Sequence, residues 1–213
     1  MTSPARRERS ALCDTFETVG PDAPTLCSPW RTRDLAAHLV IREGRPDAAL
    51  GMLVPPLAER ARRVQDGYAA ESWPELVERV RTGPPAWSPT RLEPVDTLVN
   101  LGEMFLHHED VLRAAPDWEQ RLLPDDLERG LWSGLTRTGR LLFRRSPVGV
   151  VLVTPTYGRR LVRTPPSGAG SIVLRGTPGE LLLHASGRQR VARVTVEGPA
   201  DAREAFQGTD LSL

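Results

Sequence analysis

The stretch PWRTRDLAAHLVI, residues 29–41, sets the character of the first half of the chain. From Leu35 to Ile41 every residue except His38 is apolar, which is typical of a helix packed into a core. Thr32 has the side chain of an N-cap residue, and Asp34 follows where the helix dipole favours a carboxylate. The stretch therefore predicts a core helix that carries one histidine among apolar neighbours.

A second stretch, EMFLHHED at residues 103–110, lies inside a long helix predicted over residues 95–114. Glu103 and His107 are four residues apart, so on a helix they share one face with Cβ atoms about 5–6 Å apart. An ionised carboxylate that is buried without a partner costs several kcal/mol, as a rough figure. A divalent cation compensates such a pair well, and so does a direct hydrogen bond between the two side chains.

His38, Glu103 and His107 together make a candidate His₂Glu metal site. Three protein ligands with one open position are typical of catalytic rather than structural zinc, and the set also suits iron or nickel. Asp34 lies one turn before His38, and we expect it to orient that imidazole through its second nitrogen. The alternative is a buried, hydrogen-bonded Glu–His pair that holds no metal.

His108 is the main rival as a ligand, because a rotation of only about 100° around the helix separates it from His107. Met104, which is not an acid, lies four residues before His108, and this favours His107. We expect Glu109 and Asp110 to face solvent, with a supporting role for Asp110 beside a ligand histidine as the alternative.

Four other side chains are candidates for a functional role. Glu180 and His184 repeat the four-residue spacing in a short predicted helix, where a surface ion pair is expected. Cys13 and Cys27 have no CxxC partner, and both are expected to serve the core as free thiols in a reducing cytoplasm. The alternative is that they are metal ligands or reactive thiols.

The pattern of the chain changes near residue 146, from helical spacing to short β-rich runs with glycine turns. Further helices are expected over residues 4–18, 46–64, 72–83 and 125–145, the second of them broken by two prolines. Strands are expected at 148–154, 160–163, 171–175 and 191–196, and helices at 178–185 and 199–206. The sequence thus predicts an α+β protein, with a four-helix bundle over residues 1–146 and a small α+β domain over residues 147–213.

Composition excludes several classes of protein. The 213 residues hold 28 basic side chains, all of them arginine, against 27 acidic ones. Without lysine there can be no Schiff-base lysine, pyridoxal-phosphate anchor or P-loop lysine. A formal net charge of +1 argues against a nucleic-acid-binding protein, and no apolar run is long enough for a membrane span. GxGxxG, GxSxG and HExxH motifs are absent, and no signal peptide is visible.

The two quoted stretches resemble the mycothiol-dependent maleylpyruvate isomerase family of the DinB-like superfamily. Within it they resemble an actinobacterial group of small uncharacterised metal-binding proteins. GELLLHASGR at 179–188 and VTVEG at 194–198 resemble the small C-terminal domain of the same isomerases. The resemblance implies a DinB-like four-helix bundle whose divalent metal, usually zinc, is held by His38, Glu103 and His107.

The resemblance also implies a thiol-dependent isomerase or S-transferase, in which the metal binds the thiolate of mycothiol or another small thiol. Arg188 could hold a carboxylate substrate or the thiol cofactor through a bidentate contact, or be a solvated turn arginine beside Arg190. Two alternatives stay open: a non-catalytic metal-binding or ligand-sensing protein of the same fold, and a metal-free bundle that binds a partner.

Overall fold

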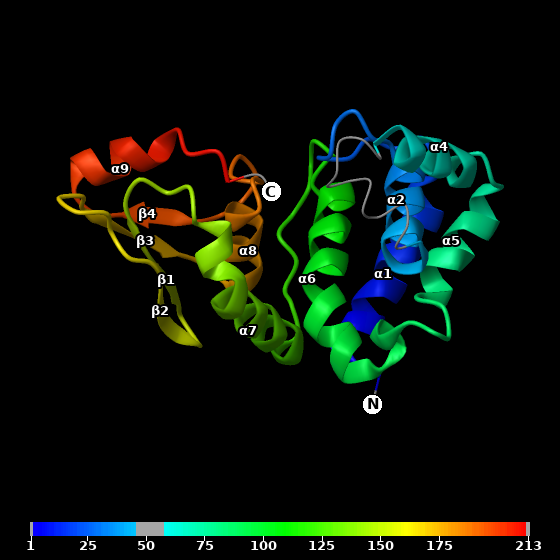
Figure 1. Ribbon diagram of the computed structural model, residues 1–213, viewed down its shortest axis with the longest axis horizontal. Coiled ribbons are helices and arrows are strands. Elements are labelled where there is room, and N and C mark those ends of the chain that lie inside the picture. The colour runs from blue at the N-terminus through cyan, green and yellow to red at the C-terminus, as the bar shows by residue number, and fades with distance from the viewer. Residues whose placement is uncertain (1, 46–57, 212–213) are drawn as a thin grey trace. The chain divides into compact units, whose positions relative to one another are not determined.

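The computed structural model describes residues 2–45 and 58–211, so most of the stretch expected as a proline-broken helix at 46–64 lies outside the described residues. The chain divides into two compact units, Met1–Arg121 and Leu122–Leu213, and each is treated by itself. Figure 1 labels the helices and strands of both.

The first unit is helical throughout its described part. Its elements are α1 (Pro4–Val19), α2 (Thr32–Gly44), α4 (Ala58–Ala69), α5 (Trp73–Thr82), the 3₁₀ turn η3 (Pro89–Arg91) and α6 (Glu93–Leu112). Helix α1 packs against α5 and α6, while α2 packs against α4 and α5 (Figure 1). The core between them is made of buried apolar side chains from several helices, among them Leu12, Phe16, Leu35, Leu76 and Met104.

Hydrogen bonds at the N-terminus of α2 explain why this helix begins at Thr32. Asp34 accepts a hydrogen bond from the backbone N–H of Arg31 at 2.9 Å, so the carboxylate satisfies a free donor of the first turn. Arg31 is therefore the N-cap, and Thr32, which the sequence suggested for that position, is the first helical residue. The Thr32 hydroxyl instead donates to the carbonyl of Gly20 at 2.6 Å, which ties α2 to the end of α1.

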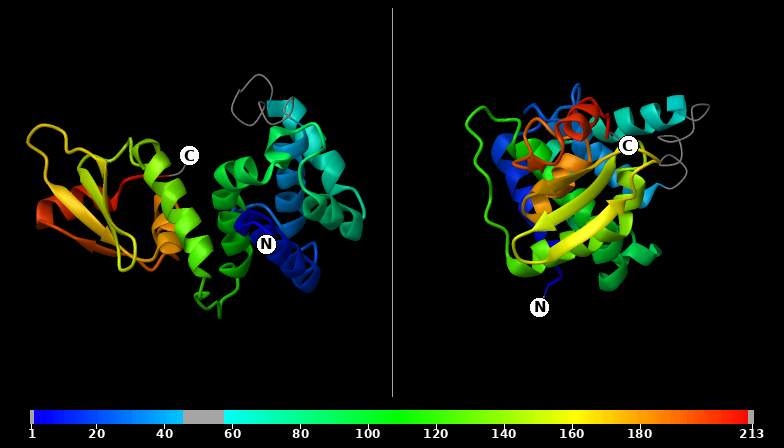
Figure 2. Two further views of the ribbon diagram at one scale, coloured as in Figure 1. Left: turned by 90° about the horizontal axis from the view of Figure 1, so that it is seen from below. Right: turned by 90° about the vertical axis from the view of Figure 1, so that its left-hand side faces the viewer.

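The second unit is an α+β module, and the predicted α+β class is confirmed. Its elements are α7 (Asp125–Leu142), β1 (Gly149–Thr154), β2 (Gly158–Arg163), β3 (Ser171–Arg175), α8 (Pro178–Ala185), β4 (Thr195–Glu197) and α9 (Ala200–Gln207). The sheet has the order β2-β1-β3-β4, in which β1 and β3 are parallel and the other two pairings antiparallel. Figure 2 shows α7 and α8 on the same side of this sheet. The strand expected at 191–196 forms only over Thr195–Glu197.

Helix α7 belongs to this second unit, whereas the sequence analysis placed residues 125–145 in the bundle. It packs against α8 and β2, and Gly139 permits the close approach of the strand. A Cβ atom at Gly139 would lie 2.5 Å from Cγ1 of Val162. The division of the chain therefore falls between Arg121 and Leu122 rather than at residue 146. The change to β-rich sequence near residue 146 marks where the sheet begins. Helix α7, which packs on the sheet, comes before that change and belongs to the same unit.

Candidate metal centre

His107 lies on the buried face of α6 with an acidic side chain at each ring nitrogen. Its Nδ1 is 3.0 Å from Oδ2 of Asp110, and its Nε2 is 3.5 Å from Oε2 of Glu103. Burial lowers the pKa of His107, but hydrogen bonds with Asp110, Cys27 and Glu103 outweigh it and raise the pKa to about 10. Without a metal, this imidazole therefore carries a proton on each nitrogen.

His38 of α2 lies next to His107, as the sequence predicted. The two ring centroids are 5.3 Å apart, and Trp30 lies on His38 at 5.0 Å. The Nδ1 of His38 is buried and has no hydrogen-bond partner among the described residues. Burial and the charge of His107 lower the pKa of His38 to about 4, so this imidazole is neutral near pH 7.

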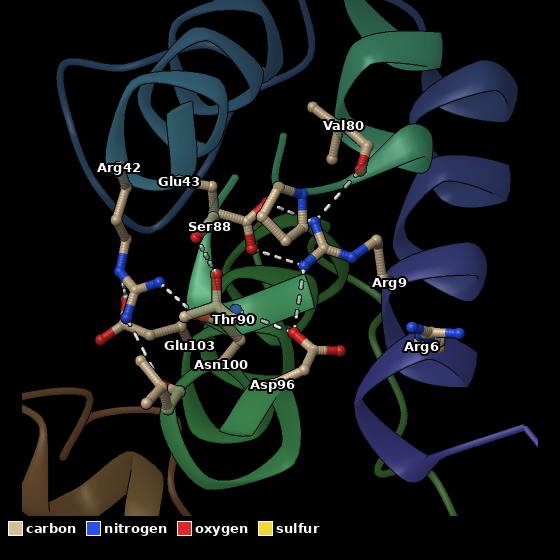
Figure 3. Close-up of polar contacts among 12 residues, drawn as sticks. Arg6, Arg9, Arg42, Glu43, Val80, Ser88, Thr90, Asp96, Asn100 and Glu103 are labelled. Carbon is tan, nitrogen blue, oxygen red and sulfur yellow. Dashed lines mark hydrogen bonds and ion pairs between the residues drawn. The ribbon is translucent and has the colours of Figure 1, made fainter. Parts of the chain in front are cut away.

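Glu103, the third predicted residue, is held in its charged form. Burial raises its pKa, but the hydrogen bond with His107 and the charge of Arg42 outweigh this and lower the pKa to about 2. Arg42 Nε lies 3.5 Å from Glu103 Oε2, and Arg42 also donates to Asn100 at 2.6 Å (Figure 3). With its side chain 35% exposed, Glu103 lies where solvent reaches the site.

The three predicted ligands lie near one another, but no choice of one donor atom from each places all three atoms within 4.8 Å of one another. Two atoms each about 2.1 Å from a tetrahedral zinc stand about 3.4 Å apart, and two imidazole rings on it have centroids about 5 Å apart. The observed 3.5 Å between Glu103 and His107, and the 5.3 Å between the rings of His38 and His107, are close to these values, but the whole set would have to draw together to hold one ion. The unpartnered Nδ1 of His38 is the kind of buried polar atom that a ligand would explain.

Cys27 and Asp110, which the sequence offered only as alternatives, lie together beside His107. Within the described residues, one group of potential ligands has all its atoms within 4.8 Å of one another, namely Cys27, His107 and Asp110. The Sγ of Cys27 lies 3.0 Å from Oδ2 of Asp110, and the N–H of Leu26 donates to the Asp110 carbonyl at 2.9 Å. This group is therefore also a possible metal site.

The contacts within this second group have hydrogen-bond lengths. A sulfur about 2.3 Å and an oxygen about 2.1 Å from one zinc would stand about 3.6 Å apart, well beyond the observed 3.0 Å. In this structure the Asp110 carboxylate instead accepts from both Cys27 and His107. A carboxylate on the second nitrogen of a ligand histidine fixes the ring and its tautomer.

The expectation that Glu109 and Asp110 face solvent is wrong. They are 1% and 0% exposed, because Glu109 pairs with Arg113 and Arg121 while Asp110 faces His107. The alternative, a supporting role for Asp110, agrees with its position. The spacing of three residues between His107 and Asp110 was the available signal, since it places both on one helix face.

The rival ligand and the expected orienting carboxylate have other roles. His108 is buried, with Nδ1 2.8 Å from Glu8 and Nε2 2.9 Å from Thr15, so both of its nitrogens are engaged. Asp34 does not reach His38, because its carboxylate caps the first turn of α2.

The C-terminal candidates lie in the second unit. The expected surface pair of Glu180 and His184 is wrong, since both are buried and Glu180 accepts from the N–H of Arg193 at 2.6 Å. Burial lowers the pKa of His184 to about 4, and its ring stacks on Phe206. Arg188 is half-buried and donates to the carbonyl of Ser186 at 2.7 Å.

Comparison with solved structures identifies proteins of the same fold. No family model and no curated protein sequence matches the chain. A crystal structure of a mycothiol-dependent maleylpyruvate isomerase is 15% identical, covers 92% of each chain and has a TM-score of 0.61. The chain has the fold of this isomerase. A histidine-to-alanine mutant of that enzyme matches over the same share of each chain, with 16% identity and a TM-score of 0.53. Among the described residues, no helix combines the length and apolar character needed to cross a bilayer.

Proposed function

We propose that this chain binds one divalent metal ion, zinc, through His38, Glu103 and His107, and uses it with a small thiol such as mycothiol. The observation that carries the proposal is the placement of His107. Asp110 engages Nδ1, while Nε2 faces Glu103 and the ring lies beside that of His38. A metal ion on Nε2 would complete a carboxylate–histidine–metal arrangement, with one coordination position left for a further ligand.

The donor set supports an open, catalytic type of centre. A metal ion bound there would lower the pKa of a thiol that takes the open position, and so supply a thiolate at neutral pH. The chain itself contributes a neutral His38 and an ionised Glu103, while Asp110 fixes the ring of His107. Metal binding would displace the proton from Nε2 of His107.

The proposed reaction class is isomerisation or S-transfer with mycothiol as cofactor, by analogy with the structurally similar mycothiol-dependent maleylpyruvate isomerase. Arg188, in the second unit, is the proposed contact for a carboxylate substrate because a guanidinium can pair with a carboxylate in bidentate geometry. One of its terminal nitrogens already donates to the carbonyl of Ser186. The proposal also places the chain in the cytoplasm, where thiols stay reduced, and within the actinobacterial metal-binding subgroup.

Titration of mycothiol into the cobalt-loaded protein tests this function. Direct thiolate ligation would add a thiolate-to-cobalt charge-transfer band in the near ultraviolet, and the thiol would release its proton at neutral pH. The Glu103→Gln variant is the control, because it should neither hold the cobalt nor give the band. Turnover of maleylpyruvate-like acids in the presence of the thiol would then identify the reaction.

An unchanged cobalt spectrum at saturating thiol would contradict the thiol-dependent function. It would favour the second candidate, a metal-binding or ligand-sensing protein without thiol chemistry. A specific observation is compatible with that candidate: Arg42 lies on the carboxylate of Glu103 and is anchored by Asn100, so a cation already occupies one side of the site.

A further inference from the structure

The first unit has a cavity of about 320 Å³ whose lining is strongly basic. It lies between α1, the end of α5 and the turn η3, and four arginines line it: Arg6, Arg9, Arg81 and Arg91. Asp96 is the one acidic residue of the lining. None of the three proposed metal ligands lines this cavity.

Arg9 gives the cavity a rigid, buried contact point. It is 4% exposed, and its two terminal nitrogens lie 2.7 and 2.5 Å from the carboxylate of Glu43. It also donates to the carbonyl of Val80 at 3.1 Å and lies 3.6 Å from Asp96 (Figure 3). Four helices, α1, α2, α5 and α6, therefore fix this guanidinium in place.

One donor of Arg9 is left over. Its Nε–H has no acceptor among the described residues, and the side chain lines the cavity. Gly83, another lining residue, has no side chain to cover it, since a Cβ there would stand 3.4 Å from Nε.

Arg6 and Arg91 leave positive charge uncompensated at the cavity wall. Arg6 donates to the carbonyl of Arg91 at 3.1 Å, and Arg91 donates to the carbonyl of Pro84 at 2.9 Å. In the described part of the chain neither guanidinium pairs with a carboxylate. Arg81 differs from them, because Asp14 and Glu17 neutralise it. Two unneutralised cations thus line the same cavity as Arg9, whose Nε–H has no acceptor among the described residues.

We propose that this cavity is a binding site for a small multivalent oxyanion, a phosphate group or a dicarboxylate. Arginine forks match the oxygens of both groups in bidentate geometry. The cavity volume is at the lower end of the range for small-molecule sites, which suits an anion of this size. A bound oxyanion would supply the negative charge that Arg6 and Arg91 lack.

Calorimetric titration of the whole chain with inorganic phosphate, succinate and chloride at constant ionic strength tests this site. Metal is first removed with a chelator and dialysis, so that phosphate cannot bind through a metal ion. We expect saturable binding of phosphate or succinate, and no saturation with chloride. Preference between the two oxyanions identifies the ligand group. The Arg6→Gln/Arg91→Gln double variant should bind the preferred anion at least tenfold more weakly.

The matched control is Arg137→Gln/Arg140→Gln, which removes two positive charges from exposed positions of α7 in the other unit. It should keep the wild-type affinity, and circular dichroism should show both double variants folded. Equal affinity in the two double variants, or chloride binding as tightly as the oxyanions, would overturn the proposal.

Discussion

The Nδ1 atom of His107 lies 3.0 Å from Oδ2 of Asp110, a carboxylate with no solvent exposure. This contact decides how the candidate centre works. With Nδ1 engaged by Asp110, Nε2 of His107 faces Glu103, and the orientation of the ring is fixed before a metal ion binds.

The Asp110→Asn variant should bind zinc about 10–100-fold more weakly than the wild type, because the ring of His107 loses its charged partner. Competition with a chromophoric chelator measures the affinity. Asp34→Asn is the control, since Asp34 caps α2 and does not contact His38. Equal losses of zinc affinity in the two variants would show that Asp110 does not specifically support metal binding by His107.

Much of the site was predictable from sequence, for a physical reason. Spacing along one helix determines which side chains share a face, so Glu103 and His107 were placed correctly beside each other. The apolar run around His38 indicated that it points inward. Cys27 could not be found in this way, because it lies in a loop before α2 and reaches Asp110 only through tertiary packing.

The burial of Glu109 was also not predictable from the local sequence pattern. Glu109 is buried because Arg121, twelve residues later, pairs with it. In the fold, helix boundaries followed from caps and prolines, yet the unit to which α7 belongs depends on a contact between Gly139 and Val162. Such long-range partners are not encoded in any single window of sequence.

The pair of Arg9 and Glu43 should contribute strongly to the stability of the first unit. Both side chains are at most 5% exposed, so Glu43→Gln leaves a buried cation short of its partner, at a cost of about 3 kcal/mol. Urea unfolding measures this change. Glu59→Gln is the control: its partner Arg62 is exposed, and no measurable change is expected. A Glu43→Gln variant as stable as the control would contradict the prediction.

His184 should make the second unit less stable in acid. Its pKa is about 4 in the folded state against about 6.5 when unfolded, so between these values the unfolded chain binds more protons. Stability is therefore lost as the pH falls through this window, by about 2 kcal/mol from His184 at pH 5. Urea unfolding at pH 7.5 and pH 5, followed by circular dichroism, should show a smaller loss for His184→Gln. An identical loss in wild type and variant would exclude this residue as the cause.

The two cysteines should differ in their reaction with iodoacetamide. Cys13 is fully buried, and burial raises its thiol pKa to about 12, whereas Cys27 is half-buried. Mass spectrometry of the native protein should find one modified residue, and two after unfolding in urea. The Cys27→Ser variant should lose the native modification. Retention of that modification would mean that Cys13 is the accessible thiol.

Metal content in matched variants tests the central claim most directly. Purified without added metal and then loaded with zinc, the wild type should bind close to one equivalent per chain by elemental analysis. His38→Ala and Glu103→Gln should lose this metal, while Cys27→Ser should retain it. Loss of the metal in Cys27→Ser together with its retention in His38→Ala would contradict the account and assign the ion to Cys27, His107 and Asp110 instead.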